Sequence, residues 1–266
     1  MRYPEIDIVK GIAVIFMVIF HFFYLAYFMD VKKYPIDKGI LRFLAKAAHT
    51  TFIFMVGVNL ALGYQRYEVN KKDNDARFGK SIKRSFFLYL AGIIVSIFSY
   101  LAFKDMFVKF GIFHFIATAI VISQLVVHSQ LLSLVGAGII SLIHLIKTNF
   151  SMLLYDKCQN IPFICFITGL YNIKYSALDH FPIIPWLAVI FMGIFFGHTL
   201  YSRAKRNFNG ELIDKLSNNN VGKKIGFLGK HSLSIYFIHF PLFYFILYRY
   251  KKHFMDQTPI LNPYDN

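Results

Sequence analysis

The chain has 266 residues, 56% of them hydrophobic and 16% charged, and its formal net charge is +15. Several apolar runs reach the ~18–20 residues that a helix needs to cross a bilayer, which excludes an ordinary soluble domain. Alternating segments of ~10 residues, the pattern of a transmembrane β-barrel, do not occur. The sequence therefore predicts an all-α, multi-pass transmembrane helix bundle of about seven or eight spans, forming a single domain over residues 1–266.

The excess of Lys and Arg suits cytoplasmic loops beside anionic lipid, so no nucleic acid is expected as a partner. Such loops can also attract an anionic cosubstrate. Cys158 and Cys165 are too few and too closely spaced to define a disulfide framework or a metal site, and no metal is expected. The first apolar run is too long for a cleavable signal.

The first predicted span, residues 8–28, carries a polar stripe. Asp7 precedes it, Lys10 lies in its first turn and His21 about two-thirds along. At ~100° per residue these side chains share one helical face, with Lys10 and His21 about 16 Å apart along the axis. An ionisable group at membrane depth is costly and is by default a candidate functional residue. The structural alternative is a neutral His21 hydrogen-bonded between helices.

Six further spans are predicted, at residues 40–64, 82–102, 110–128, 131–147, 182–202 and 232–249. The apolar patch 161–170 is too short to cross as a helix, so residues 148–181 are interpreted as a long loop with a re-entrant or surface-lying piece. With seven spans, the basic loops near 66–84 and 203–230 lie on the side of the N-terminus. The positive-inside bias makes that side cytoplasmic, and a spanning 161–170 would invert the C-terminal half.

Other polar residues are candidates on the middle spans. Arg42, Lys46 and His49 share one face of the second span, where the first two can extend to the interface and His49 lies deeper. Arg84 at the start of the third span suits either an interface anchor or a phosphate contact. His114 lies one turn inside the fourth span.

The last two spans add further candidates. Asp179 and His180 are an acid and a possible base at the mouth of the sixth span. Trp186, near its start, is a candidate ligand contact or simply marks the headgroup level. His239 lies in the last span, in register with Tyr236 and just before Pro241, which is expected to kink the helix. A histidine there could line a cavity or make a packed polar contact.

Six blocks of the sequence resemble, in order, those of one family. EIDIVKGIAVIFMVIFH is similar to its first-helix pattern, and FIFMVGVNLAL, RSFFLYLAG, FGIFHFIA, FPIIPWLAVIFMGIFFG and LGKHSLSIYFIHFPL follow. The family is the heparan-α-glucosaminide N-acetyltransferase-like group of membrane proteins (the DUF1624 type), related more distantly to the acyltransferase-3 membrane enzymes. Arg2, Asp7, Lys10, Gly11 and His21 match its first-helix motif, Arg84 and His114 match later blocks, and Lys10 replaces an arginine of the acyltransferase-3 pattern.

The resemblance implies an acetyltransferase that moves an acetyl or other acyl group from acyl-CoA, met on the cytoplasmic side, to a saccharide acceptor such as an amino sugar. His21 is the candidate base, with His114 and Asp7 as further catalytic candidates. On one straight helix Asp7 lies about 21 Å from His21, so Asp7 is expected to pair with Lys10 or an arginine instead.

Lys10, Arg84 and His49 are assigned to the acetyl-CoA site, and Asp179, Trp186 and His239 to the acceptor. A proton-coupled small-molecule transporter or flippase is the main alternative, although no inverted repeat is seen. A non-catalytic scaffold would leave the polar stripe unexplained. The acceptor, the acyl length, N- versus O-acylation, acylation of histidine itself, the membrane occupied and a homodimer are left open.

Overall fold

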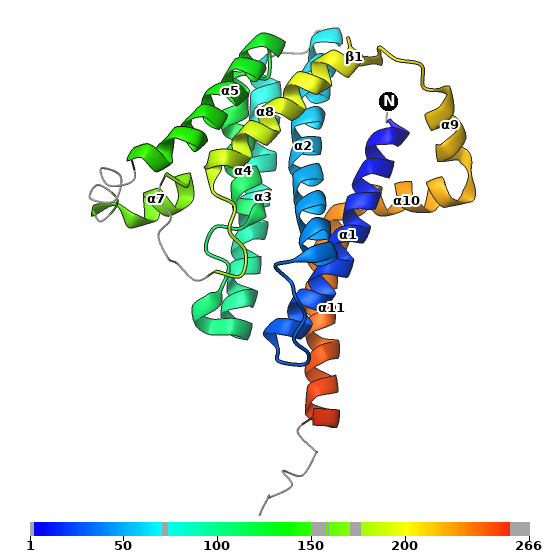
Figure 1. Ribbon diagram of the computed structural model, residues 1–266. Coiled ribbons are helices and arrows are strands. Elements are labelled where there is room, and N and C mark those ends of the chain that lie inside the picture. Colours follow the sequence, from blue (N-terminus) through cyan, green and yellow to red (C-terminus); the bar gives the residue numbers. More distant parts are fainter. Residues whose placement is uncertain (1–2, 71–73, 151–157, 159, 171–176, 256–266) are drawn as a thin grey trace, which may run out of the picture. The chain divides into compact units, whose positions relative to one another are not determined.

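A computed structural model describes residues 3–70, 74–150, 158, 160–170 and 177–255. Within these residues the chain is almost entirely helical, which confirms the all-α prediction (Figure 1). Arg2, Lys71 and Lys72 lie outside the described residues. The helices are α1 Pro4–Phe28, α2 Gly39–Val69, α3 Asn74–Phe103, α4 Ile112–Ile122, α5 Gln130–Ile146, α7 Pro162–Thr168, α8 Ile183–Leu200, α9 Glu211–Asn218, α10 Asn220–Lys230 and α11 Ser232–Tyr250. Two short strands, β1 Tyr201–Ser202 and β2 Lys205–Arg206, form an antiparallel pair after α8.

Four described helices, α1, α2, α3 and α8, are long and apolar enough to cross a membrane. The pair α10 and α11, bent by 78° at their junction, makes a fifth if it is one broken span, and two shorter apolar helices cover Ile112–Leu125 and Gln130–Ile146. Each of the seven predicted ranges overlaps one of these helices, and the number of helices that cross a membrane stays a prediction. The patch 161–170 forms the seven-residue helix α7, as its length predicted.

Backbone contacts divide the chain into two compact units: unit 1 is Met1–Phe52 with Gly210–Asn266, and unit 2 is Ile53–Asn209. The prediction of a single domain stays a prediction. In unit 1, α10 crosses the first half of α1 (Figure 1). A Cβ on Gly11 would collide with the carbonyl of Ile225, and one on Gly229 with that of Asp7. Glycine at both positions therefore lets the two backbones touch.

In unit 2, α2 and α8 meet through small residues. A Cβ on Gly193 would collide with the carbonyl of Phe54, and one on Gly57 with that of Ile190. Gly193 and Gly197 are four residues apart on α8, the small-xxx-small spacing that allows close approach of membrane helices. A Cβ on Gly197 would meet Val58 and Ala61, so the contacts of Gly193 and Gly197 advance in the same direction along α2, and the two helices run parallel.

Helices α3 and α4 run antiparallel, joined by serine hydroxyls. Ser85 Oγ donates to the carbonyl of Ala117 at 2.7 Å, and Ser96 Oγ to that of Val108 at 2.6 Å. Near the start of α3, the Arg77 guanidinium donates to Gln124 Oε1 at 3.0 Å, just past the end of α4. This pairing aligns the beginning of α3 with the end of α4.

Gln65 joins the carboxyl ends of α2 and α8. Its buried amide nitrogen donates to the carbonyl of Tyr201 at 3.0 Å, and its Oε1 accepts the Ala204 N–H at 2.8 Å. The start of α5 lies at the same end, because Gln130 Nε2 donates to Thr199 Oγ1 at 2.9 Å. One end of unit 2 therefore gathers the end of α2, the start of α3 and the segments 123–130 and 199–207.

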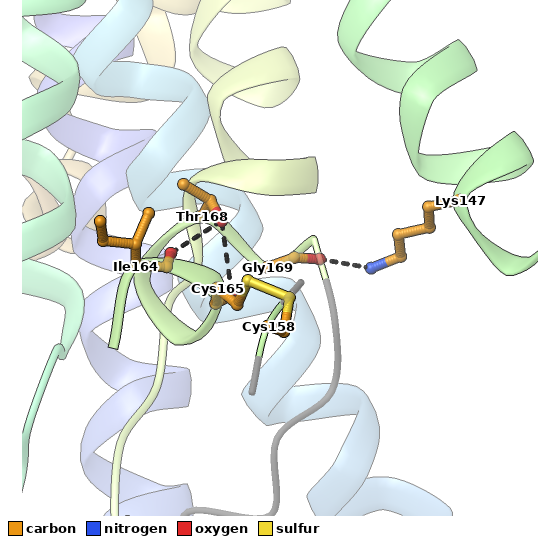
Figure 2. The surroundings of a disulfide bond; sticks show 6 residues. All are labelled: Lys147, Cys158, Ile164, Cys165, Thr168 and Gly169. Atoms are coloured by element: carbon orange, nitrogen blue, oxygen red, sulfur yellow. Dashed lines mark hydrogen bonds between the residues drawn. A yellow bond between two sulfur atoms is a disulfide. The ribbon is translucent and has the colours of Figure 1, made fainter. Parts of the chain in front are cut away.

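The opposite end of unit 2 contains a disulfide between Cys158 and Cys165 (Figure 2). Cys165 lies in α7, which ends at Gly169. Lys147, at the end of α5, donates to the carbonyl of Gly169 at 2.8 Å. The sequence alone gave these two cysteines no role, and the structure assigns them to a local bridge in the long loop 148–181.

Candidate functional site

His21 and His239 form a hydrogen-bonded pair within unit 1. His21 Nδ1 lies 2.9 Å from His239 Nε2, and the two ring centroids are 5.0 Å apart. His239 Nδ1 lies 2.8 Å from the carbonyl oxygen of Ile235, one turn earlier on α11. This pair joins α1 to α11 across 218 residues of sequence, and such an inter-helical bond is also what the structural alternative for His21 expects.

Aromatic rings surround the histidine pair. Tyr236 meets the His21 ring edge-on at 6.3 Å, and Phe240 meets it edge-on at 5.8 Å. Phe243 contacts the His239 ring at 5.9 Å. His239 is 5% exposed and His21 is half-buried, so apolar surfaces shield the bond between them from competing water.

His49 on α2 belongs to the same unit and lies near enough to His21 for the charges of the two rings to interact. Of the residues expected to hold acyl-CoA, it is the one that lies close to the candidate base in unit 1. Its half-buried ring places a third imidazole beside the pair.

Asp7 and Lys10 lie in the first two turns of α1, far from His21. The helix is continuous from Pro4 to Phe28, so the axial separations of about 21 Å and about 16 Å hold. Both side chains lie in the part of α1 that α10 crosses, where Gly229 packs on the carbonyl of Asp7. Gly11, which matches the first-helix motif, serves this helix contact rather than chemistry.

His114 is buried in unit 2, where it is 5% exposed. Its ring packs on Gly92 of α3, where a Cβ would come within 2.8 Å of Cε1, and lies edge-on to Tyr89 at 5.0 Å. Phe110 stacks on it at 5.9 Å. Its buried Nδ1 has no hydrogen-bond partner, which is unusual for a polar atom in a protein interior.

Asp179 lies beside the start of α4. Its Oδ2 accepts the N–H of Ile112 at 3.1 Å, and the segment around it pairs with the chain before α4 through a hydrogen bond from Phe181 N–H to the Phe110 carbonyl at 3.1 Å. Although Asp179 is partly exposed as a residue, burial of its carboxyl raises its pKa to about 6, and the Ile112 bond opposes that shift. Asp179 therefore binds the N-terminal end of α4, and His114 lies in the first turn of that helix.

The other candidates of unit 2 are spread along it. Trp186 lies in α8, with its ring 5.2 Å from Phe181, and is half-buried. Arg84 is exposed on α3, next to the buried Ser85. It lies eight residues before Gly92, about 12 Å from the His114 contact along the axis.

From the sequence, His180 is a possible base beside Asp179, and the structure gives it a packing role instead. Its ring stacks on Phe166 of α7 with centroids 3.9 Å apart, and its Nε2 donates to the Phe166 carbonyl at 2.9 Å. Burial lowers the pKa of His180, and this hydrogen bond opposes the shift. His180 thus anchors α7. The sequence gives little indication of this anchoring role, because the hydrogen-bond partner of His180 is a backbone carbonyl, which any residue has.

The structure therefore brings the predicted residues together in two groups, each within one unit. His21, His49 and His239 form the first group, while His114 and Asp179 form the second. Asp7, Lys10 and Arg84 lie apart from them along their helices. In the described part of the chain, no group of three His, Cys, Asp or Glu side chains could hold a metal ion.

Comparison with protein families gives one finding. The model described as "Heparan-alpha-glucosaminide N-acetyltransferase, catalytic" matches residues 2–241. The matched region contains His21, His114 and His239, and it includes both units. No curated protein and no solved structure matches the chain.

Proposed function

Since the chain belongs to the heparan-α-glucosaminide N-acetyltransferase catalytic family, we propose that it is an integral membrane acetyltransferase that uses acetyl-CoA. The acceptor proposed is the amino group of a glucosamine-type sugar in a glycan. The observation that carries the proposal is the family match over residues 2–241, which includes His21 at membrane depth. Imidazole is a common general base in acyl transfer, because its ordinary pKa is close to neutral pH.

In the proposed reaction, the acceptor amine attacks the thioester carbonyl and a C–N bond forms. His21 takes the proton that the amine loses, and the C–S bond breaks when the tetrahedral intermediate collapses. The thiolate of CoA leaves and takes up that proton from His21, which returns to its neutral form. The products are the N-acetylated sugar and CoA, and no metal takes part in these steps.

Acyl-CoA is proposed to approach from the basic end of unit 2. That end carries Arg66, Arg77, Lys80, Lys83, Arg84, Arg203, Lys205 and Arg206. Among the described residues, the opposite end carries Lys104, Lys109 and Lys147. A concentration of positive charge attracts the phosphates of CoA and also marks the cytoplasmic side of a membrane protein.

The disulfide supports the same orientation independently of charge. Cys158 and Cys165 lie at the end of unit 2 opposite the basic turns. Disulfides persist in oxidising compartments and are rare in the cytosol. We therefore place the disulfide end outside and the basic end in the cytoplasm, and with seven spans the N-terminus is cytoplasmic too.

The test of function uses the full chain in detergent with acetyl-CoA and glucosamine. Release of CoA thiol and mass-spectrometric detection of N-acetylglucosamine are expected from the unmodified protein. His21→Ala should abolish both, whereas His253→Ala, at an exposed position beyond the end of α11, should change neither. An unmodified, folded protein that releases no CoA with any of a panel of amino sugars would contradict the proposal. Uptake of labelled sugar into proteoliposomes without CoA release would point to the transporter alternative.

The orientation has its own test. In a background lacking both native cysteines, Asn160→Cys should react with a membrane-impermeant maleimide in intact cells, and Ser202→Cys should react only after permeabilisation. Both positions are exposed in the structure. The reverse pattern would overturn the orientation and leave the acetyl transfer to be judged separately.

A further inference from the structure

The hydrogen bonds of the histidine pair fix where its protons lie. A backbone carbonyl can only accept, so His239 Nδ1, 2.8 Å from the Ile235 oxygen, carries a hydrogen. A neutral imidazole has one N–H, which leaves His239 Nε2 with a lone pair. That nitrogen accepts at 2.9 Å from His21 Nδ1, which must therefore carry the hydrogen of its own ring.

These hydrogen bonds leave Nε2, the other ring nitrogen of His21, without a hydrogen. With the hydrogen on Nδ1, the lone pair of the neutral ring is at Nε2, so Nε2 is the basic atom of His21. The chain of bonds runs in one direction, from His21 through His239 to Ile235. In the neutral pair His239 cannot be the group that takes a proton from a ligand, because its lone pair already accepts from His21.

The surroundings hold both rings in this arrangement. His239 is 5% exposed, and Tyr236 contacts both rings, at 6.3 Å from His21 and 5.6 Å from His239. Phe240 and Phe243 lie edge-on to the pair. Rotation of either ring would break a hydrogen bond in a place with little water to replace it.

We propose that His239 is a positioning residue for acetyl transfer, which selects the Nε2-basic tautomer of His21 and stabilises its protonated form. The inference rests on the proposed function. When His21 Nε2 takes the proton of the acceptor amine, the new positive charge is shared through the Nδ1–H bond to His239 Nε2. The proton then passes from Nε2 to the departing sulfur, so the pair ends as it began.

From the sequence, Asp7 is too far along α1 to position the His21 ring in this way. In many acid–base sites a carboxylate holds the second nitrogen of the histidine. Here Asp7 is about 21 Å along α1 from His21, whereas His239 is in direct contact. A second imidazole, itself fixed by a carbonyl, takes the place of the carboxylate and adds no negative charge to the membrane interior.

The experiment compares His239→Ala with His239→Gln in the full-length protein. The glutamine amide oxygen can still accept from His21 Nδ1, whereas alanine leaves that N–H without an acceptor. We expect His239→Ala to lower kcat by about 100-fold with KM for acetyl-CoA nearly unchanged, and His239→Gln to recover at least about tenfold of that loss. The pH profile of kcat should shift in both variants, and His253→Ala serves as the control.

Selective ¹⁵N labelling of histidine gives a readout independent of turnover. In the unmodified protein, the His21 signals should show a protonated Nδ1 and an unprotonated Nε2, and the two tautomers should mix in His239→Ala. A His239→Ala protein with unchanged kcat and pH profile would overturn the proposal, as would an Nε2-protonated His21. If the unmodified protein releases no CoA, the proposed function fails, and the spectrum alone decides the tautomer assignment.

Discussion

Replacing Asp179 with asparagine should stabilise the protein above pH 6. The buried carboxyl of Asp179 has a pKa of about 6, against 3.8 for the unperturbed group. Because the folded-state pKa is raised, the stability associated with the protonated group is complete below about pH 4 and is lost as the pH rises through about 6. The difference of about two pKa units corresponds to a penalty of up to about 3 kcal/mol at pH 8.

Asparagine carries no charge, and its Oδ1 can still accept the N–H of Ile112 at the start of α4. Asp179→Asn should therefore be more stable than the unmodified protein at pH 8, by about 1–3 kcal/mol, and nearly equal to it at pH 3.5. Asp37→Asn, at an exposed position, is the control and should shift stability little at either pH.

Unfolding by sodium dodecyl sulfate in maltoside micelles, followed by the fluorescence of Trp186, measures this difference. Trp186 is the one tryptophan of the chain and lies in α8 of the same unit, with its ring 5.2 Å from Phe181. A destabilised Asp179→Asn at both pH values would refute the reasoning, since it would mean that the carboxylate stabilises the fold. A stabilised variant with reduced transfer would identify Asp179 as a residue kept at a cost in stability.

Two further substitutions test the packing around the candidate residues. Gly11→Ala should destabilise unit 1 by about 1–3 kcal/mol, because its Cβ collides with the Ile225 carbonyl, whereas Gly226→Ala, with its nearest neighbour at 4.0 Å, should be tolerated. Thermal loss of helix, followed by circular dichroism, measures the stability of both variants. Equal destabilisation by Gly11→Ala and Gly226→Ala would contradict the close contact between Gly11 and Ile225. Gln65→Leu should cost about 2 kcal/mol by removing the hydrogen bonds of Gln65 to the Ala204 N–H and the Tyr201 carbonyl, and Gln65→Glu should keep the Ala204 bond. Unfolding of both Gln65 variants is followed by Trp186 fluorescence. A Gln65→Leu protein as stable as the unmodified one would show that the hydrogen bonds of Gln65 do not stabilise the fold.

Hydropathy alone was enough to predict the helical class and the positions of the apolar spans. It also predicted that 161–170 is too short to cross as a helix, and the helix found there, α7, has seven residues. The region between the last two spans was treated as a basic loop, yet it contains α9 and α10. Its lysines hid the amphipathic pattern, and the contact of Gly229 with α1 depends on tertiary structure that no local pattern reveals.

The candidate site was predictable residue by residue but not as an arrangement. The position of His21 on a polar stripe marked it as a candidate, and the kink before Pro241 drew attention to His239. Their pairing across 218 residues could not be derived, because helical periodicity gives the face of each helix and not its neighbour. The Cys158–Cys165 bridge escaped prediction for a similar reason, since a spacing of seven residues does not specify a bond.

The bend between α10 and α11 has a consequence for the lipid bilayer. If α11 runs close to the membrane normal, a turn of 78° lays α10 nearly flat along the surface. Lys223, Lys224 and the exposed Phe227 share one face of α10, so the two lysines would then bind phosphates of the lipid headgroups, with the Phe227 ring beside them. Part of the chain's positive charge would thus be occupied by phospholipid, and anionic lipids would compete with soluble anions for these lysines.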